Sequence, residues 1–205
     1  MRDSRVVLLA VCVAVLVPAL TWGQAPATPA VAPAKLDAKP ASAIDADFVR
    51  RQFGDQFTLV PEIGAMVGDL DGDGIEDAVI AARCKNPLLD EAEHNYTVID
   101  PYYEFFGYGD PRVTTSFGQN DPSNRGLVVL VIHGAGAEAW RSATPKAKYV
   151  LINLPYRALS IRRMRLGKKT IGAIYAEEGN DLHESSAIYF DKKTYKYVPM
   201  GSDVE

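Results

Sequence analysis

The chain of 205 residues has few of the residues that most enzyme and metal-site signatures require. Its two cysteines, Cys12 and Cys84, cannot build a disulfide framework. Its three histidines, His94, His133 and His183, are far apart in sequence, and the H-E-x-x-H pattern of zinc hydrolases is absent. The nucleophile pentapeptide G-x-S-x-G is missing as well. These absences exclude a disulfide-stabilised scaffold and argue against two large hydrolase classes.

The chain also lacks positive charge in excess and a long apolar run. Its formal net charge of -4 argues against a dedicated nucleic-acid binder. The longest uncharged apolar segment, Val6–Leu20, is interrupted by Pro18 and follows Arg2 and Arg5. It is shorter than the roughly 20 residues of a spanning helix, so it predicts a signal peptide over residues 1–23, with an uncleaved anchor as the alternative. We therefore expect a secreted or periplasmic protein without a stable membrane span after cleavage.

A spacer follows this segment. Residues 24–43 contain eight alanines and four prolines and no aromatic side chain. Proline fixes φ and removes backbone donors, which favours an extended, semi-rigid chain over a helix. We predict a disordered linker over residues 24–43 and a folded domain over residues 44–205, which is long enough to bury a real core.

Short runs of apolar and β-branched residues dominate the predicted domain. The run Leu127–Ile132 (LVVLVI) is continuous, which suggests a strand buried on both faces. The polar turn Asp191–Thr194 between two such runs indicates a terminal hairpin. The expected strands are Gln56–Val60, Gly64–Val67, Ala78–Ala82, Leu127–Ile132, Tyr149–Leu154, Thr170–Ala176, Ala187–Phe190 and Tyr195–Val198.

Helical patterns are rare by comparison. Asp45 is placed to cap a short helix that runs through Phe53 and ends at Gly54. No helical pattern alternates with the strands, so the sequence predicts a mainly β fold, a single antiparallel β-rich domain, over a βαβ arrangement. An α+β fold is the alternative.

One segment carries specific chemistry. Residues 68–82 read GDLDGDGIEDAVIAA, with aspartates at positions 1, 3, 5 and 9 of a loop and Gly74 at position 6. Oxygen donors at every second position suit Ca²⁺, because the glycine permits the sharp turn and the carbonyl at position 7 adds a ligand. The alternative is a solvated acidic loop between two strands. The predicted Ca²⁺ ligands are Asp69, Asp71, Asp73, Ile75 through its carbonyl, and Asp77.

The loop does not fit an EF-hand, because Ile80 stands where a bidentate glutamate is required. Gly68–Ala82 instead resembles the calcium loop of FG-GAP (VCBS-type) repeats, in which a D-x-D-G-D-G-x-x-D turn joins two strands of an integrin-type propeller blade. No Phe-Gly pair precedes the motif, and Ala81-Ala82-Arg83 replaces the usual ending. The motif occurs once, whereas a propeller needs at least four blades. The resemblance therefore implies a calcium-clasped hairpin, as in single-copy members found in exported bacterial proteins.

A long connection between two expected strands, residues 94–126, is rich in aromatic residues. Such connections are usually functional or disordered, and the aromatic content argues against disorder. We favour rings that pack against the sheet, with a ligand or partner surface as the alternative. Asp100, Glu104 and Asp110 could pair there as acid and base on a carbohydrate. The rings belong to Tyr96, Tyr102, Tyr103, Phe105, Phe106, Tyr108 and Phe117.

Two weaker features remain. His133–Gly136 is similar to the oxyanion turn of lipases, but without the nucleophile pentapeptide we interpret it as a histidine that ends a strand, followed by a flexible turn. Six basic residues fall within residues 157–169, and a solvated hairpin that protects an edge strand accounts for them best. Anionic envelope polymers or lipid headgroups are the alternative partners of this stretch.

Together these features predict an exported, non-enzymatic calcium-binding module with a structural Ca²⁺ site. We expect a binding, adhesion or envelope role, an unidentified protein or carbohydrate partner, no nucleic acid and no catalytic residues. The alternative is a secreted hydrolase that acts on a carbohydrate or another polymer through residues 94–126.

Overall fold

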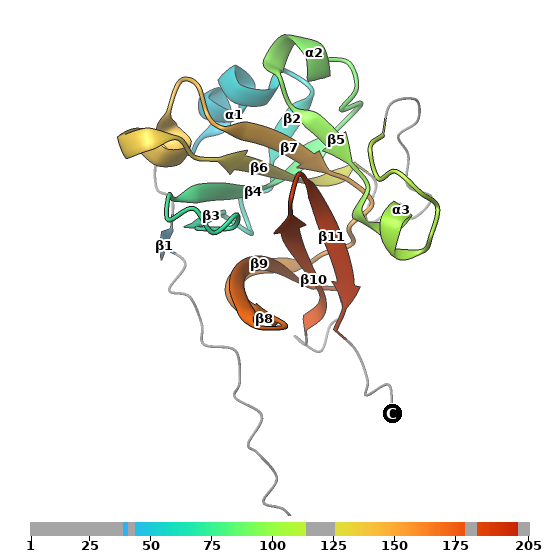
Figure 1. Ribbon diagram of the computed structural model, residues 1–205. Helices are drawn as coiled ribbons and strands as arrows, with labels where there is room; N and C mark the ends of the chain where they lie inside the picture. Colours follow the sequence, from blue (N-terminus) through green and yellow to red (C-terminus); the bar gives the residue numbers. More distant parts are fainter. Residues whose placement is uncertain (1–38, 41–43, 114–125, 179–183, 201–205) are drawn as a thin grey trace, which may run out of the picture. The chain divides into compact units, whose positions relative to one another are not determined.

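Strands dominate the part of the chain that the structure describes, residues 39–40, 44–113, 126–178 and 184–200 of a computed structural model (Figure 1). These residues all belong to one compact unit, residues 32–205. The predicted signal peptide and the predicted linker, except for residues 39–40, lie outside the described residues. None of the described helices is long and apolar enough to cross a membrane.

The larger sheet has the strand order β1-β3-β4-β6-β7-β5, and β2 also pairs with β4. Its central strands β4 and β6 are almost entirely buried, because both of their faces are covered. The strands are β1 (Lys39–Pro40), β2 (Phe57–Leu59), β3 (Ala65–Gly68), β4 (Asp77–Cys84), β5 (Thr97–Ile99), β6 (Leu127–His133) and β7 (Ala147–Leu151). Two residues of the expected linker thus form β1, which pairs with β3.

The smaller sheet has the order β11-β10-β9-β8 and is antiparallel throughout. Its strands are β8 (Ala158–Leu166), β9 (Lys169–Glu177), β10 (Glu184–Asp191) and β11 (Thr194–Pro199). β8 is an edge strand, and it carries most of the basic stretch of residues 157–169. Residue 157 precedes β8, residues 167–168 form the turn into β9, and residue 169 begins β9. The predicted terminal hairpin is confirmed as β10 and β11, with Asp191 opposite Thr194.

The helices are short: α1 (Ala46–Phe53), α2 (Glu91–His94), α3 (Pro101–Phe105) and the 3-10 helix η1 (Gly136–Arg141). The prediction for α1 is confirmed, since the Asp45 side chain accepts a hydrogen bond from Phe48 N at 2.7 Å and Gly54 ends the helix at φ 96°. Figure 1 shows α1 on one side of β4, β6 and β7, with the smaller sheet on the other.

Two apolar clusters hold these layers together. One joins the buried face of α1 and Trp140 of η1 to one face of the larger sheet. The other fills the space between the two sheets, where Val79 and Val131 meet Ile174 and Ile188. Burial of both faces explains why β4 and β6 are continuous apolar runs without alternation.

Each of the eight predicted strands overlaps a strand of the structure, although β7 ends at Leu151 and residues 152–154 of the predicted Tyr149–Leu154 lie outside it. The fold is mainly β with antiparallel sheets, as expected. The prediction of a long connection over residues 94–126 is wrong in part, because this segment contains β5 and α3. β5 pairs with β7 in parallel, which the antiparallel prediction did not include. The strand is only three residues long, too short to stand out from its aromatic surroundings.

Candidate metal centre

The acidic loop, residues 69–77, closes the hairpin of β3 and β4, next to the end of β6 and the start of β7. Gly68 pairs with Asp77 across this hairpin. β6 runs beside β4 with Ala78 opposite Ile132, and β7 begins beside the end of β6 with His133 opposite Ala147. Residues far apart in sequence therefore lie beside the loop, where these strands of the larger sheet end or begin.

Three of the four predicted carboxylates converge there. One carboxylate oxygen from each of Asp69, Asp71 and Asp77 lies within 4.8 Å of the other two. Oxygen ligands lie about 2.3–2.6 Å from Ca²⁺, so two ligand oxygens on one ion are at most roughly 5 Å apart. The spacing and the hard, anionic donors therefore fit a calcium ion.

The loop backbone holds these carboxylates in place. Asp69 accepts hydrogen bonds from Gly72 N at 2.7 Å and from Gly74 N at 3.0 Å, and Asp71 accepts one from Asp73 N at 3.1 Å. Gly72 and Gly74 have φ of 79° and 83°, a region that glycine enters without steric penalty. The D-x-D-G-D-G spacing thus places side-chain oxygens inside a tight turn whose N–H groups face inward.

Asp77 is the most deeply buried of the four, with 1% of its surface exposed. Its Oδ2 accepts from Leu70 N and its Oδ1 from Gly134 N, each at 2.8 Å. Burial raises the pKa of Asp77 to about 7, although the two backbone hydrogen bonds oppose this shift. Near neutral pH a proton and a bound cation would compete for this carboxylate, and the cation would stabilise its charged form.

Asp73, the fourth predicted carboxylate, is not part of the converging group. Its Oδ2 lies 2.8 Å from the Nζ of Lys146, and its Oδ1 accepts from Ile75 N at 2.8 Å. The hydrogen bond from Lys146 holds the pKa of Asp73 below its usual value. The carbonyl of Ile75 stays a predicted ligand.

A buried histidine connects the loop to the smaller sheet. His133 Nε2 lies 2.7 Å from the hydroxyl oxygen of Tyr195 on β11, and its Nδ1 lies 3.4 Å from Asp71 Oδ2. A tautomer with the proton on Nδ1 suits both contacts, since Nε2 then accepts from the tyrosine hydroxyl. Burial lowers the pKa of His133 to about 4. A neutral histidine thus bridges β11 and the loop.

The smaller sheet approaches the loop so closely that only glycine fits at the contact. A Cβ added to Gly172 of β9 would overlap the carbonyl oxygen of Asp69. At the residue that follows β6, a Cβ on Gly134 would overlap the carbonyl oxygen of Glu76. The loop is therefore in close contact with both β9 and the residue after β6.

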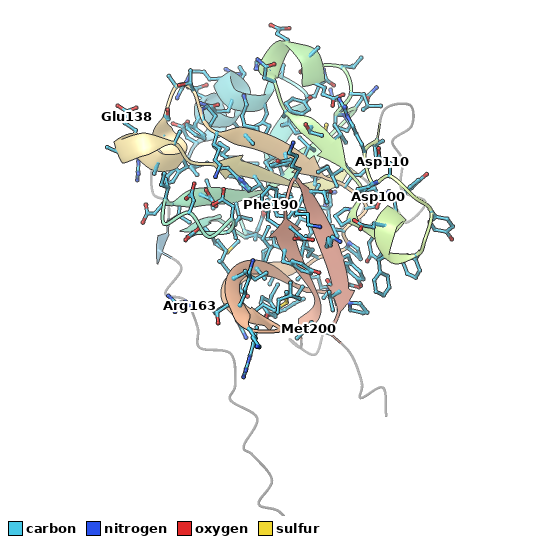
Figure 2. All side chains as sticks on the ribbon, viewed as in Figure 1. Asp100, Asp110, Glu138, Arg163, Phe190 and Met200 are labelled. Carbon is cyan, nitrogen blue, oxygen red and sulfur yellow. The ribbon has the colours of Figure 1, made fainter. Side chains whose placement is uncertain are left out.

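The residues of the predicted hydrolase alternative have other partners. Asp100 caps α3 by accepting from Tyr102 N at 3.0 Å, and its other oxygen accepts from Asn153 Nδ2 at 2.5 Å. Glu104 pairs with Lys196 at 3.0 Å, and Asp110 accepts from Arg112 N at 2.9 Å. Asp100 and Asp110 lie beside α3 (Figure 2). The Gly134 N–H, which an oxyanion site would need, is bound to Asp77.

The aromatic residues of the segment divide into two groups. Tyr96 is buried in the cluster beneath α1, and the Tyr102 ring packs on Tyr197 with centroids 4.3 Å apart. These rings pack against the sheets, as favoured. A second group, on α3 and the turn after it, is exposed and consists of Tyr103, Phe105, Phe106 and Tyr108. Phe117 lies outside the described residues.

No known family model, curated protein or solved structure matches the chain. The resemblance to FG-GAP-type loops therefore rests on Gly68–Ala82 alone and stays a prediction. The sequence interpretation missed Lys146 and Tyr195, and it gave His133 no role in the loop. The density of carboxylates in the loop could have indicated such residues, since buried acidic groups need cationic or hydrogen-bonding partners.

Proposed function

We propose that the protein is an exported, non-enzymatic calcium-binding module in which Ca²⁺ stabilises the loop between β3 and β4. The convergence of Asp69, Asp71 and Asp77 within 4.8 Å carries this proposal. Carboxylates at this spacing repel one another unless a cation is shared between them. The predicted signal peptide over residues 1–23 supports export, which would place the site in compartments rich in calcium.

A structural role for the metal agrees with the position of the loop. The loop touches β6 through Gly134, β9 through Gly172 and β11 through the histidine bridge. An ion held here would stabilise the contacts of the loop with these parts of the two sheets. His133 and Tyr195 are 1% and 0% exposed, so they offer no substrate a path to this network.

A binding role is supported by the exposed aromatic side chains of α3 and its following turn. Phe106 and Tyr108 are 57% and 73% exposed. Aromatic residues are enriched where proteins contact partners, because they offer a large apolar area with few rotatable bonds. We propose this face as the contact surface for a protein or carbohydrate partner.

Thermal denaturation of the purified protein tests the calcium site. We expect calcium to raise the melting temperature relative to EDTA, because an ion at a hundredfold excess over its Kd stabilises the folded state by about 2.7 kcal/mol. The double variant Asp69→Asn/Asp71→Asn should lose this shift. Glu76→Gln, an exposed change in the same loop, should retain it. Identical wild-type melting curves in calcium and in EDTA would contradict the proposal.

A further inference from the structure

Lys146, the residue before β7, places its ammonium group on two carboxylates of the acidic loop. Its Nζ lies 2.6 Å from Asp71 Oδ2 and 2.8 Å from Asp73 Oδ2. Its backbone N donates to the carbonyl of His133 at 3.0 Å, which fixes the residue beside the loop. The lysine side chain is 51% exposed and that of Asp71 is 3% exposed, so the lysine reaches a buried carboxylate from the solvent side.

The oxygens that Lys146 contacts are ones that the predicted calcium coordination needs. The other oxygen of each carboxylate already accepts a backbone hydrogen bond, from Asp73 N in Asp71 and from Ile75 N in Asp73. The oxygens of Asp71 and Asp73 that contact Lys146 are therefore not the ones that hold the loop backbone. The neighbouring lysine of β7 is used elsewhere, since Lys148 Nζ donates to the carbonyl of Gln52 at 2.6 Å.

An ammonium group and a calcium ion on the same carboxylate oxygen would lie only a few ångströms apart. At that distance two positive charges repel each other, and each weakens the attraction of the carboxylate for the other. The pair cannot be held together without a large loss of binding free energy. Calcium binding through Asp71 and Asp73 therefore requires the ammonium group to move away.

We propose that Lys146 is a built-in counter-ion of the loop that competes with Ca²⁺ and is displaced when the ion binds, an inference that rests on the calcium-binding function proposed above. In the calcium-free protein the lysine offsets part of the negative charge of Asp71 and Asp73 and keeps the loop folded. In the calcium-bound protein its side chain turns to solvent. The lysine thereby lowers the calcium affinity.

Calcium titration calorimetry on the full chain tests this competition. Lys146→Met should bind calcium about tenfold more tightly than wild type, since it removes a charge-assisted contact to each of two ligands. Lys168→Met provides the control, because it removes the same charge from an exposed turn between β8 and β9. It should leave the Kd within about twofold of wild type, as screened surface charges have little effect at a distance. Lys146→Arg, which keeps the charge, should stay close to wild type.

A second measurement uses the wild-type protein alone. Its lysines are labelled with an amine-reactive reagent in EDTA and in calcium, and the labelling at each position is read by mass spectrometry. Displacement predicts that Lys146 is labelled several-fold faster in calcium, whereas Lys168 is labelled at the same rate in both. Equal labelling of Lys146 in both conditions, in protein that binds calcium, would overturn the competition.

The outcomes separate the two proposals. If wild type binds calcium and Lys146→Met binds no more tightly, the competition is refuted and the calcium function stands. If only Lys146→Met binds, the lysine blocks the site, and the calcium function of the wild-type chain fails. If neither protein binds calcium, both proposals fail.

Discussion

The acidic loop has buried ends and an exposed tip, although both parts are built from aspartates at the same spacing. At the ends, Leu70 and Asp77 are each 1% exposed, and the Asp71 side chain is 3% exposed. At the tip, residues 72–74 and Glu76 are exposed. Asp77 holds the backbone of Leu70 and Gly134, which belong to different parts of the fold. Asp73 holds only its own loop and the half-exposed Lys146.

The aspartates share one spacing in the sequence, but their packing in the fold gives them different roles. A carboxylate at the buried end connects structural elements whether or not an ion is present. A carboxylate at the tip has little to stabilise except a cation. Substitutions at the buried ends should therefore lower mainly the stability of the fold, whereas substitutions at the tip should weaken mainly calcium binding.

The largest effect is expected from Asp77→Ala at the buried end. The change leaves the N–H groups of Leu70 and Gly134 without their acceptor, and each buried unsatisfied group costs ~1–3 kcal/mol. We expect the free energy of unfolding to fall by about 4 kcal/mol in urea denaturation with EDTA present. Glu76→Ala at the tip should stay within about 0.5 kcal/mol of wild type. Equal losses of unfolding free energy in the two variants would show that the buried end and the exposed tip of the loop contribute equally to stability.

A smaller effect is expected from the pH dependence of His133, which also belongs to the buried end. Burial lowers its pKa from 6.5 to about 4, so the unfolded chain takes up a proton before the folded protein does. The stability that neutral His133 contributes is therefore present above pH 6.5 and is lost as the pH falls to about 4.

The test compares wild type with His133→Phe, which keeps an aromatic ring but does not titrate. The difference in unfolding free energy between the two should shrink by about 3 kcal/mol between pH 7 and pH 4 in EDTA. Urea denaturation at a series of pH values measures this difference. A constant difference over that range would show that the histidine is not held in its neutral form.

The smallest effect is expected at the tip and concerns calcium rather than folding. Asp73→Ala should weaken calcium binding by about tenfold, or about 1.4 kcal/mol, because it removes a predicted ligand charge. Glu76→Ala should change the Kd by less than about twofold, since position 8 of the loop points away from the ion. Calorimetry on both variants decides this. Comparable losses would mean that the predicted ligand register is wrong.

The fold was predictable where a strand is long and buried on both faces. β4 and β6 are continuous apolar runs, and such runs have few alternatives to a central strand. β8 was harder to identify, because arginines interrupt its apolar pattern, and it appeared only as part of a basic hairpin. The parallel pairing of β5 with β7 depends on how the chain returns to the sheet edge, and three residues cannot encode that.

The candidate site was predictable only where its residues are local in sequence. The spacing of Asp69, Asp71 and Asp77 predicts oxygens around one centre, and these three carboxylates converge. Lys146 is separated from Asp71 by 75 positions, and Tyr195 from His133 by 62 positions. They reach the loop only because β6 ends beside it and β7 and β11 begin beside it, which no local pattern reveals.

Calorimetric titration of CaCl₂ into the wild-type protein, after removal of metal by chelation, measures calcium binding directly. We expect saturable binding of one ion per chain, and loss of that binding in Asp69→Asn/Asp71→Asn with the fold retained by circular dichroism. A wild-type protein that takes up no calcium, or a double variant that binds as wild type does, would refute the calcium site.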